Sequence, residues 1–241
     1  MLKKKDSEDY EVWEEVFDKP TLMTMYNLFN HGVITEIFGA IKSGKESKLY
    51  LGKGADDADI AIKIYLTASA EFRRGMLPYV VGDPRFKVVR KGSRALIYLW
   101  ARKEFKNLQK ALDAGVRVPR PIQVEKNVLV MEFIGENGLP APTLKEVPPS
   151  NPEQTYQTVL RYVKLLYQKA NLVHSDLSEY NIMSINAEPV IFDVGQAVHI
   201  EHPNAREYLL RDLQTLTRFF KQQGIPVETA EDLYDWVTRD D

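Results

Sequence analysis

Three polar side chains stand at fixed spacing late in the chain, and their chemical types suit phosphoryl transfer. His174, Asp176 and Asn181 form the pattern H-x-D-x-x-x-x-N in the segment HSDLSEYN. Asp193 follows as D-V-G at the end of a second apolar run. In such a site an aspartate accepts the proton of the attacking hydroxyl, while an asparagine and a second aspartate hold Mg²⁺ against nucleotide phosphates. Three fixed residues arise by chance about once in 8,000 start positions, so the remaining parts of the site must decide.

These residues are expected to meet in space. Asp176 precedes a predicted hairpin over 182–192, whose adjacent strands would bring Asn181 close to Asp193. Two carboxylates and an amide at one point repel one another without a cation, which favours Mg²⁺ or Mn²⁺ bound by oxygen ligands. His174 is expected to support the loop by a hydrogen bond rather than to take part in the chemistry.

A lysine and a glutamate earlier in the chain could complete such a site. In the predicted strand 59–65, Lys63 shares a face with the small residue Ala61, so it could reach into a cleft and bind the α- and β-phosphates. A lone lysine more often faces solvent, but the run AIK matches the V-A-I-K signature. Glu104 falls on the apolar stripe of a predicted helix. A carboxylate there is costly unless it is paired, so Lys63 is its expected partner; a glutamate reaching solvent from the stripe edge is the alternative.

The glycine-containing segment GAIKSGK resembles a P-loop but departs from it in two ways. Glu46 replaces the Ser or Thr that would bind Mg²⁺, and the residues that follow form a predicted strand rather than a helix. A turn between two strands fits better, and a plain hairpin turn without function is the alternative. If the turn is functional, the groups expected to lie over the phosphates are Ser43, Gly44, Lys45 and Ser47.

The apolar run Val128–Phe133 is a predicted buried strand that ends where a hinge would begin. A strand that leaves one lobe here presents backbone groups to the edge of an adenine. We expect the carbonyl of Glu132 and the N–H of Ile134 to bind it, with Met131 packed behind. The end of an ordinary core strand would look the same.

The elements that position these residues indicate an α+β fold of two lobes with a nucleotide cleft between them. We expect an N-terminal helical extension over 1–35, a strand-rich N-lobe over 36–134 and a helical C-lobe over 135–241. The boundary falls in a segment rich in Pro and Gly. Predicted helices cover 21–31, 96–114, 153–170, 204–222 and 229–238; predicted strands cover 34–41, 47–51, 59–65, 128–133, 182–185 and 190–192, with the last two joined by the turn 186–189.

Composition excludes several classes of protein. The 241 residues are 44% hydrophobic and 27% charged with a net charge of −2, so the chain is not a globally basic nucleic-acid binder. It has no apolar run near 20 residues and no apolar signal segment behind its basic N-terminus, so neither a membrane span nor secretion is expected. Without cysteine there is no disulfide partner and no thiolate site, which fits a cytoplasmic protein.

Together, HSDLSEYN, the D-V-G-Q-A run, SGKES and MEFIGE resemble the RIO-type atypical protein kinases, most closely the short archaeal form of the first RIO subfamily. The resemblance runs from about 21 to 220. It implies a reduced kinase fold that uses ATP with Mg²⁺ or Mn²⁺ and phosphorylates itself on serine. By matching motifs, Asp176 is the catalytic aspartate, Asn181 and Asp193 are metal ligands, and Lys63 is the phosphate-side lysine. Asp193 could also become a phosphoaspartate in an ATPase-like cycle.

The resemblance further implies a role in maturing the small ribosomal subunit, with ribosomal RNA and protein of a pre-ribosomal particle as partners. Ser175 replaces the arginine of H-R-D, Val194 replaces the phenylalanine of D-F-G, and only 48 residues follow Asp193. An ATP-driven switch on a particle is therefore expected rather than phosphorylation of a protein in trans. In the basic segment 79–95, predicted to be a mobile loop, Ser93 is a candidate autophosphorylation site or an ordinary loop serine.

Two other functions share these motifs. A small-molecule phosphotransferase of the aminoglycoside or choline type also carries H-x-D-x-x-x-x-N and D-x-G, but it usually needs a larger helical lobe for its acceptor. A pseudokinase would bind nucleotide or a partner without turnover. The presence of Lys63, Glu104, Asp176, Asn181 and Asp193 favours an enzyme over a pseudokinase.

Overall fold

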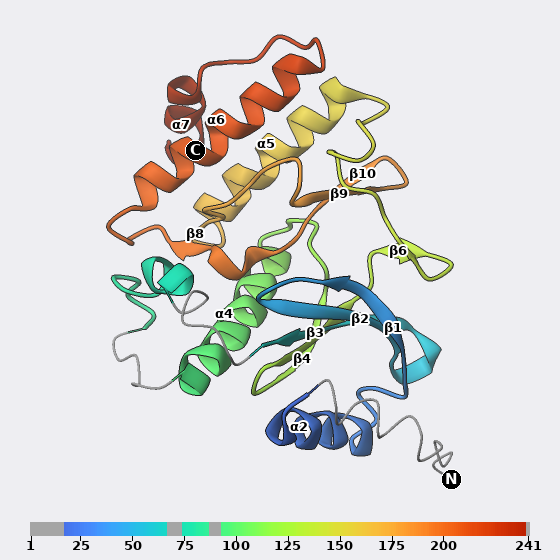
Figure 1. Ribbon diagram of the computed structural model, residues 1–241. Coiled ribbons are helices and arrows are strands. Elements are labelled where there is room, and N and C mark those ends of the chain that lie inside the picture. Colours follow the sequence, from blue (N-terminus) through green and yellow to red (C-terminus); the bar gives the residue numbers. More distant parts are fainter. Residues whose placement is uncertain (1–16, 67–73, 87–92, 240–241) are drawn as a thin grey trace.

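The computed structural model describes residues 17–66, 74–86 and 93–239. Figure 1 shows a sheet-rich part formed by the first half of the chain and a helical part formed by the second half. The elements of the first half are α2 (Lys19–Asn30), β1 (Glu36–Ser43), β2 (Ser47–Lys53), η1 (Ala55–Asp57), β3 (Asp59–Tyr65), η2 (Leu77–Tyr79), α4 (Ser93–Asp113), β4 (Pro121–Glu125) and β5 (Val128–Glu132). The second half contains β6 (Gly135–Glu136), β7 (Leu139–Pro140), α5 (Pro152–Gln168), β8 (Leu172–Val173), β9 (Ile182–Ile185), β10 (Glu188–Ile191), η3 (Val194–Gln196), β11 (Val198–His199), α6 (Ala205–Gln222) and α7 (Ala230–Thr238).

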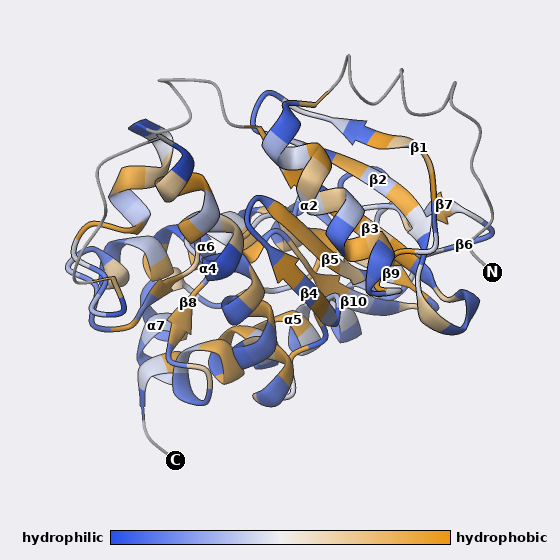
Figure 2. Cartoon of the chain, turned by 90° about the horizontal axis from the view of Figure 1, so that it is seen from below, coloured by the Kyte–Doolittle hydropathy of each residue, from blue (hydrophilic) through white to orange (hydrophobic). Residues whose placement is uncertain are grey.

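The first half folds around an antiparallel sheet of five strands in the order β1-β2-β3-β5-β4. Side chains alternate across β3, as predicted. Its three isoleucines are buried on the face that α2 covers, with Met25 and Leu28 of that helix. Ala61 and Tyr65 are buried on the opposite face with residues of α4. Seen from the α2 side, the central strands are strongly hydrophobic (Figure 2). Lys63 therefore leaves the sheet on the face of α4.

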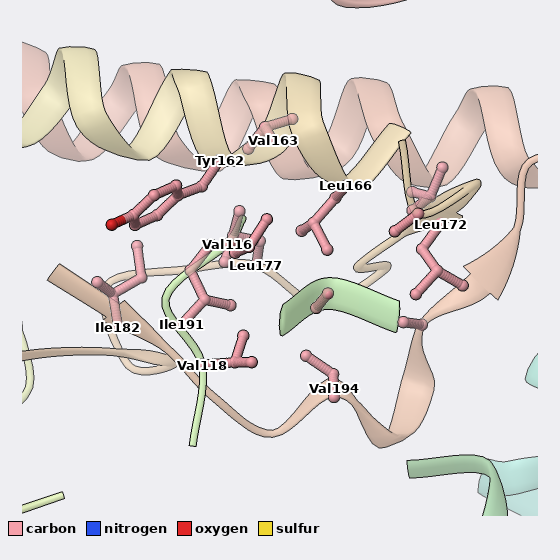
Figure 3. Packing of buried hydrophobic residues seen from close by; sticks show 14 of the residues in the cluster. Val116, Val118, Tyr162, Val163, Leu166, Leu172, Leu177, Ile182, Ile191 and Val194 are labelled. Atoms are coloured by element: carbon pink, nitrogen blue, oxygen red, sulfur yellow. The ribbon is translucent and has the colours of Figure 1, made fainter. Parts of the chain in front are cut away.

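The helical half is built around α5, whose apolar stripe packs on the segments that carry the motifs. Figure 3 shows Tyr162 and Leu166 of α5 directed toward Leu177 and Val194, and Val163 belongs to the same buried cluster. Leu177 follows Asp176, and Val194 follows Asp193. Both are at most 2% exposed. The same apolar core therefore anchors the backbone next to Asp176 and the backbone next to Asp193.

The predicted fold class is confirmed, and the predicted elements are recovered with shifts of a few residues at their ends. The half-buried strand β4 was not predicted, because it begins at a proline and has no clear alternation of apolar and polar residues. The hairpin turn is shorter than predicted. Asn186 and Ala187 have positive φ values of 51° and 62° and form the turn alone, while Glu188 and Pro189 already pair with β9.

The prediction of a mobile loop over 79–95 is wrong for its first half. Val80 is fully buried and Asp83 is 2% exposed, and Arg85 binds Asp83 with an Nη2–Oδ2 distance of 2.6 Å. Residues 87–92 lie outside the described residues. Ser93 begins α4, and its side chain is likewise not described. Among the helices that the structure describes, no stretch is both long and apolar enough to pass through a lipid bilayer.

Candidate active site

Lys63 joins the two halves of the candidate site. Its Nζ lies 2.9 Å from both carboxylate oxygens of Glu104 on α4 and 2.7 Å from Oδ1 of Asp193. The side chain of Glu104 is 1% exposed, so the pairing predicted from its place in an apolar stripe is confirmed. Burial raises the pKa of Glu104 to about 7, with Lys63 opposing that change. Burial acts to lower the pKa of Lys63, but the carboxylates of Asp193 and Glu104 outweigh it and raise the pKa.

Asp193 stands at a backbone position that few side chains adopt. Its φ of 58° and ψ of 48° place it in the left-handed region, immediately before η3. Its side chain is half exposed, and Lys63 is the main cause that lowers its pKa. Two residues later the chain passes very close to α4. A Cβ on Gly195 would lie 3.1 Å from Nε1 of Trp100 and 3.3 Å from Oε2 of Glu104, so glycine allows this approach.

The loop that carries Asp176 is held by a buried carboxylate from α6. The Oδ2 of Asp212 accepts a hydrogen bond from the Ser175 N–H at 2.8 Å, and its Oδ1 accepts one from the Leu177 N–H at 2.9 Å. Ser175 has a φ of 71°, and its carbonyl accepts a hydrogen bond from Arg211. Burial raises the pKa of Asp212 to about 7, and the two N–H donors oppose that change. Asp212 was not predicted from the sequence, although it lies in an apolar stripe of α6 as Glu104 does in α4.

His174 and Asn181 complete this loop. The Nε2 of His174 lies 3.2 Å from the carbonyl of Phe192, which confirms the expected supporting role. Burial lowers the pKa of His174 to about 4, so the ring is neutral at pH 7 and Nε2 donates this hydrogen bond. The Nδ2 of Asn181 donates to the Asp176 carbonyl at 2.7 Å, which leaves its Oδ1 for another partner. Burial, and then the charge of Asp193, raise the pKa of Asp176.

The predicted phosphate loop is the turn between β1 and β2. The N–H of Gly44 donates to the Ser47 carbonyl at 3.0 Å, and a Cβ at Gly44 would lie 3.3 Å from that oxygen. Ser43 and Lys45 are exposed on either side of this glycine. Burial raises the pKa of Glu46, and the charges of Asp193 and Asp176 raise it further. Glu46 therefore interacts electrostatically with both aspartates, although the sequence comparison with a P-loop identified it only as a mismatch.

The predicted adenine contacts lie at the end of β5. Met131 is 9% exposed and pairs with Ala61 of β3 across the sheet. The side chain of Glu132 binds Arg117 with distances of 2.8 and 2.9 Å, and its backbone N–H donates to the Arg120 carbonyl at 2.8 Å, so neither group is left to meet a ligand. The carbonyl of Ile134 accepts a hydrogen bond from the Ala141 N–H at 2.9 Å. That bond uses the carbonyl of Ile134 and not its N–H, which is the predicted donor to the adenine.

The oxygen atoms gathered here suit a hard divalent cation. Carboxylates and amide carbonyls are the ligands that Mg²⁺ prefers, and it usually keeps further positions for water and substrate phosphates. The described residues hold no group of three or more His, Cys, Asp or Glu side chains placed to bind a metal. An ion at this site would therefore need the amide oxygen of Asn181 and the nucleotide phosphates beside the carboxylate of Asp193.

A lysine–glutamate pair between a five-stranded sheet and a helix, facing an aspartate loop and a D-x-G segment, defines a phosphotransferase of the protein-kinase-like class. Residues 48–233 match the family model for the RIO domain. The chain belongs to the RIO family of serine/threonine protein kinases.

Two relatives illustrate this membership. The RIO-type serine/threonine-protein kinase Rio1 of Haloferax volcanii is 42% identical over 240 residues, which cover 100% of this chain and 82% of that protein. Rio1 of Methanocaldococcus jannaschii is 37% identical over 231 residues, covering 96% and 78%. Among solved structures, the Rio2 kinase–ADP/Mg²⁺–phosphoaspartate complex from Chaetomium thermophilum matches with a TM-score of 0.68 at 22% identity, over 91% of this chain and 67% of that chain. That likeness shows the shared fold.

Proposed function

We propose that this chain transfers the γ-phosphoryl group of ATP to a serine hydroxyl, with Asp176 as the proton acceptor. The observation that carries the proposal is the position of Lys63, whose Nζ lies 2.9 Å from Glu104 and 2.7 Å from Asp193. This contact unites the sheet, α4 and the D-V-G segment, which must act together in a kinase site. The raised pKa of Asp176 favours its service as a base, because a stronger base accepts the hydroxyl proton more readily.

In this proposal the nucleotide lies between the sheet and the helical half. An ammonium group has three donors, and Lys63 directs them to Glu104 and Asp193. The α- and β-phosphates would take over the donor now directed at Asp193, which would free that carboxylate. Asn181 and Asp193 would then hold Mg²⁺ or Mn²⁺, which supplies positive charge for the phosphates when it is bound.

The remaining contacts of the nucleotide follow from the same placement. The turn between β1 and β2 would cover the phosphates through Ser43, Gly44, Lys45 and Ser47. Ala61 and Met131, which pair across β3 and β5, would pack against the adenine. The carbonyl of Glu132 and the N–H of Ile134 would bind its edge. The proposed site keeps the predicted lobe boundaries, with an N-lobe over 36–134, a C-lobe over 135–241 and an N-terminal extension over 1–35.

A second reaction of the same site is the formation of a phosphoaspartate. The Rio2 complex from Chaetomium thermophilum holds ADP, Mg²⁺ and phosphoaspartate, and it has the same fold. Here Asp193 is the candidate: its carboxylate oxygen would attack the γ-phosphorus, the bond to the β-phosphate oxygen would break, and ADP would leave. Water would later hydrolyse the acyl phosphate. Such a cycle suits a conformational switch, and we propose that it acts in the cytoplasm on a pre-ribosomal small-subunit particle.

The deciding experiment uses ATP labelled at the γ-phosphate with Mg²⁺, comparing the wild type with Asp176→Ala and Asp193→Asn. Acid-stable label on serine that is lost in Asp176→Ala supports a kinase that phosphorylates itself, and mapping it tests Ser93. Label that hydroxylamine removes and that requires Asp193 supports the ATPase cycle. ATP binding without label or free phosphate would contradict both reactions and support a pseudokinase. Turnover stimulated by amino sugars rather than by ribosomal particles would support a small-molecule phosphotransferase.

A further inference from the structure

A buried lysine beside the catalytic pair has no role in the proposed chemistry. Lys103 is 1% exposed, and its Nζ donates to the carbonyls of Gly195 at 2.7 Å and Ala197 at 2.6 Å. It also lies 5.0 Å from the centre of the Trp100 ring. In the part of the chain that the structure describes, no carboxylate forms an ion pair with it. Burying an amine costs free energy unless hydrogen bonds compensate for the lost water. The partners that compensate here are backbone oxygens of the segment after Asp193.

One turn further along α4, a buried amide reaches the same segment. Asn107 is fully buried, and its Nδ2 donates to the carbonyl of Val194 at 2.8 Å and to that of Ala197 at 3.2 Å. Its Oδ1 accepts a hydrogen bond from Nη1 of Arg85 at 2.7 Å. Arg85 also donates to the Ala197 carbonyl at 3.1 Å. Residues 194–197 are therefore held through their carbonyl oxygens by fixed donors.

The two sides of this segment are bound to the same helix. Glu104 reaches the carboxylate of Asp193 through Lys63, while Lys103 and Asn107 bind the backbone that follows. The left-handed backbone of Asp193 is one that an aspartate adopts only when the surrounding structure holds it there. The hydrogen bonds to the next carbonyls supply that constraint. The side chain of Val194, which is buried in the core, also anchors the segment.

We propose that Lys103 and Asn107 are positioning residues, which fix the backbone of 194–197 and so aim the Asp193 carboxylate at the bound metal. This inference rests on the proposed role of Asp193 as a metal ligand. It assigns to α4 two functions: Glu104 orients the phosphate-side lysine, and its neighbours orient the metal ligand. Because the donors come from one rigid helix, the lysine pair and the D-V-G segment move together.

The test compares Lys103→Met with Lys106→Met. Methionine keeps a long apolar stem but removes the donor, and Lys106 is an exposed lysine on the same helix that serves as the matched control. ATP affinity is measured with and without Mg²⁺, and hydrogen exchange is followed over 193–200. We expect Lys103→Met to reduce the Mg²⁺-dependent gain in ATP affinity by about 10-fold or more, the usual cost of removing a group that orients a metal ligand. Affinity without metal should stay within about 2-fold, amide exchange over 193–200 should accelerate, and Lys106→Met should match the wild type.

Asn107→Ala decides the question if Lys103→Met does not fold, and it should change both readouts in the same direction. An unchanged Mg²⁺-dependent gain in the folded variants would overturn the inference, provided that Asp193→Asn measured beside them abolishes that gain. If Asp193→Asn keeps the gain, Asp193 is not a metal ligand, and the proposed function fails together with this inference. A loss of affinity that is equal with and without Mg²⁺ would also contradict it, because that result would indicate a merely structural role.

Discussion

The carboxylate of Asp212 binds the loop of Asp176 from both sides, accepting the N–H of Ser175 at 2.8 Å and that of Leu177 at 2.9 Å. Asp212 is 2% exposed and comes from α6, so the helical half holds the loop that carries Asp176. Ser175, which replaces the arginine of H-R-D, has a left-handed backbone that these bonds maintain. The backbone on both sides of Asp176 is thus held by a buried side chain of a different element.

Asp212→Asn tests this dependence. The amide oxygen can accept only one of the two N–H groups, and its NH₂ would face the other donor, so one buried amide is left unsatisfied. We expect a loss of about 1 to 3 kcal/mol in the free energy of unfolding, the usual cost of an unsatisfied buried group. The kcat for label transfer should fall more than the KM for ATP rises, because the nucleotide contacts are remote. Asp232→Asn in the first turn of α7 is a control, and equal kcat in the two variants would contradict the role of Asp212.

Glu104→Gln tests the lysine pair. The amide keeps the size of the side chain but removes the negative charge that faces Lys63 at 2.9 Å. Lys63 would then bind Asp193 as its remaining carboxylate partner and compete with metal for that group. We expect kcat/KM for ATP to fall by about 10-fold or more, corresponding to ~1.4 kcal/mol. Steady-state kinetics at several Mg²⁺ concentrations measures it.

The expected signature of this change is its dependence on metal. Higher Mg²⁺ should recover part of the activity of Glu104→Gln, since the ion and Lys63 compete for Asp193. The exposed Glu36 supplies the matched substitution to Gln, which should leave the kinetics unchanged. A loss of activity in Glu104→Gln that no Mg²⁺ concentration relieves would rule out the competition.

Gly195→Ala tests the close approach of the D-V-G segment to α4. The added Cβ would lie 3.1 Å from Nε1 of Trp100, so the segment or the indole must shift by a few tenths of an ångström. Overpacking of this kind costs roughly 1 to 3 kcal/mol, and a shift of the segment should weaken metal-dependent ATP binding as well. Gly75→Ala, where a Cβ meets nothing within 4 Å, should not lower stability and should leave binding unchanged. Urea unfolding and ATP titrations measure the two quantities, and a neutral Gly195→Ala would show that the segment is free to move.

The lysine–glutamate pair of the candidate site could be predicted from the sequence, while the expected nucleotide and metal contacts stay predictions. Glu104 was found because a carboxylate in an apolar stripe requires a partner, and Lys63 because its strand matched a signature. The same logic applied to α6 would have found Asp212. Lys103 gave no such signal: a lysine next to a stripe usually extends its stem toward solvent, and its burial depends on how the segment after Asp193 approaches the helix. The strand β4 could not be predicted, since pairing with β5 stabilises it more than its own residues do.

The neutral state of His174 predicts a dependence of stability on pH. Burial lowers its pKa to about 4 in the folded protein, below the ordinary value of 6.5, so the unfolded chain binds the proton first as pH falls. The stabilisation is therefore complete above pH 6.5 and is lost as pH falls toward 4. Between pH 7 and pH 5 the wild type should lose roughly 2 kcal/mol of unfolding free energy from this group.

His174→Gln removes the titrating ring while its amide can still donate to the carbonyl of Phe192. Carboxylates elsewhere in the protein also titrate below pH 6. The informative quantity is therefore the difference in the free energy of unfolding between wild type and variant at each pH. The variant should be less stable at pH 7, because a flexible amide replaces a packed ring. That deficit should shrink by roughly 2 kcal/mol at pH 5, since only the wild type pays the cost of keeping the ring neutral. Urea denaturation at the two pH values measures it, and a deficit that stays constant would show that folding does not shift the pKa of His174.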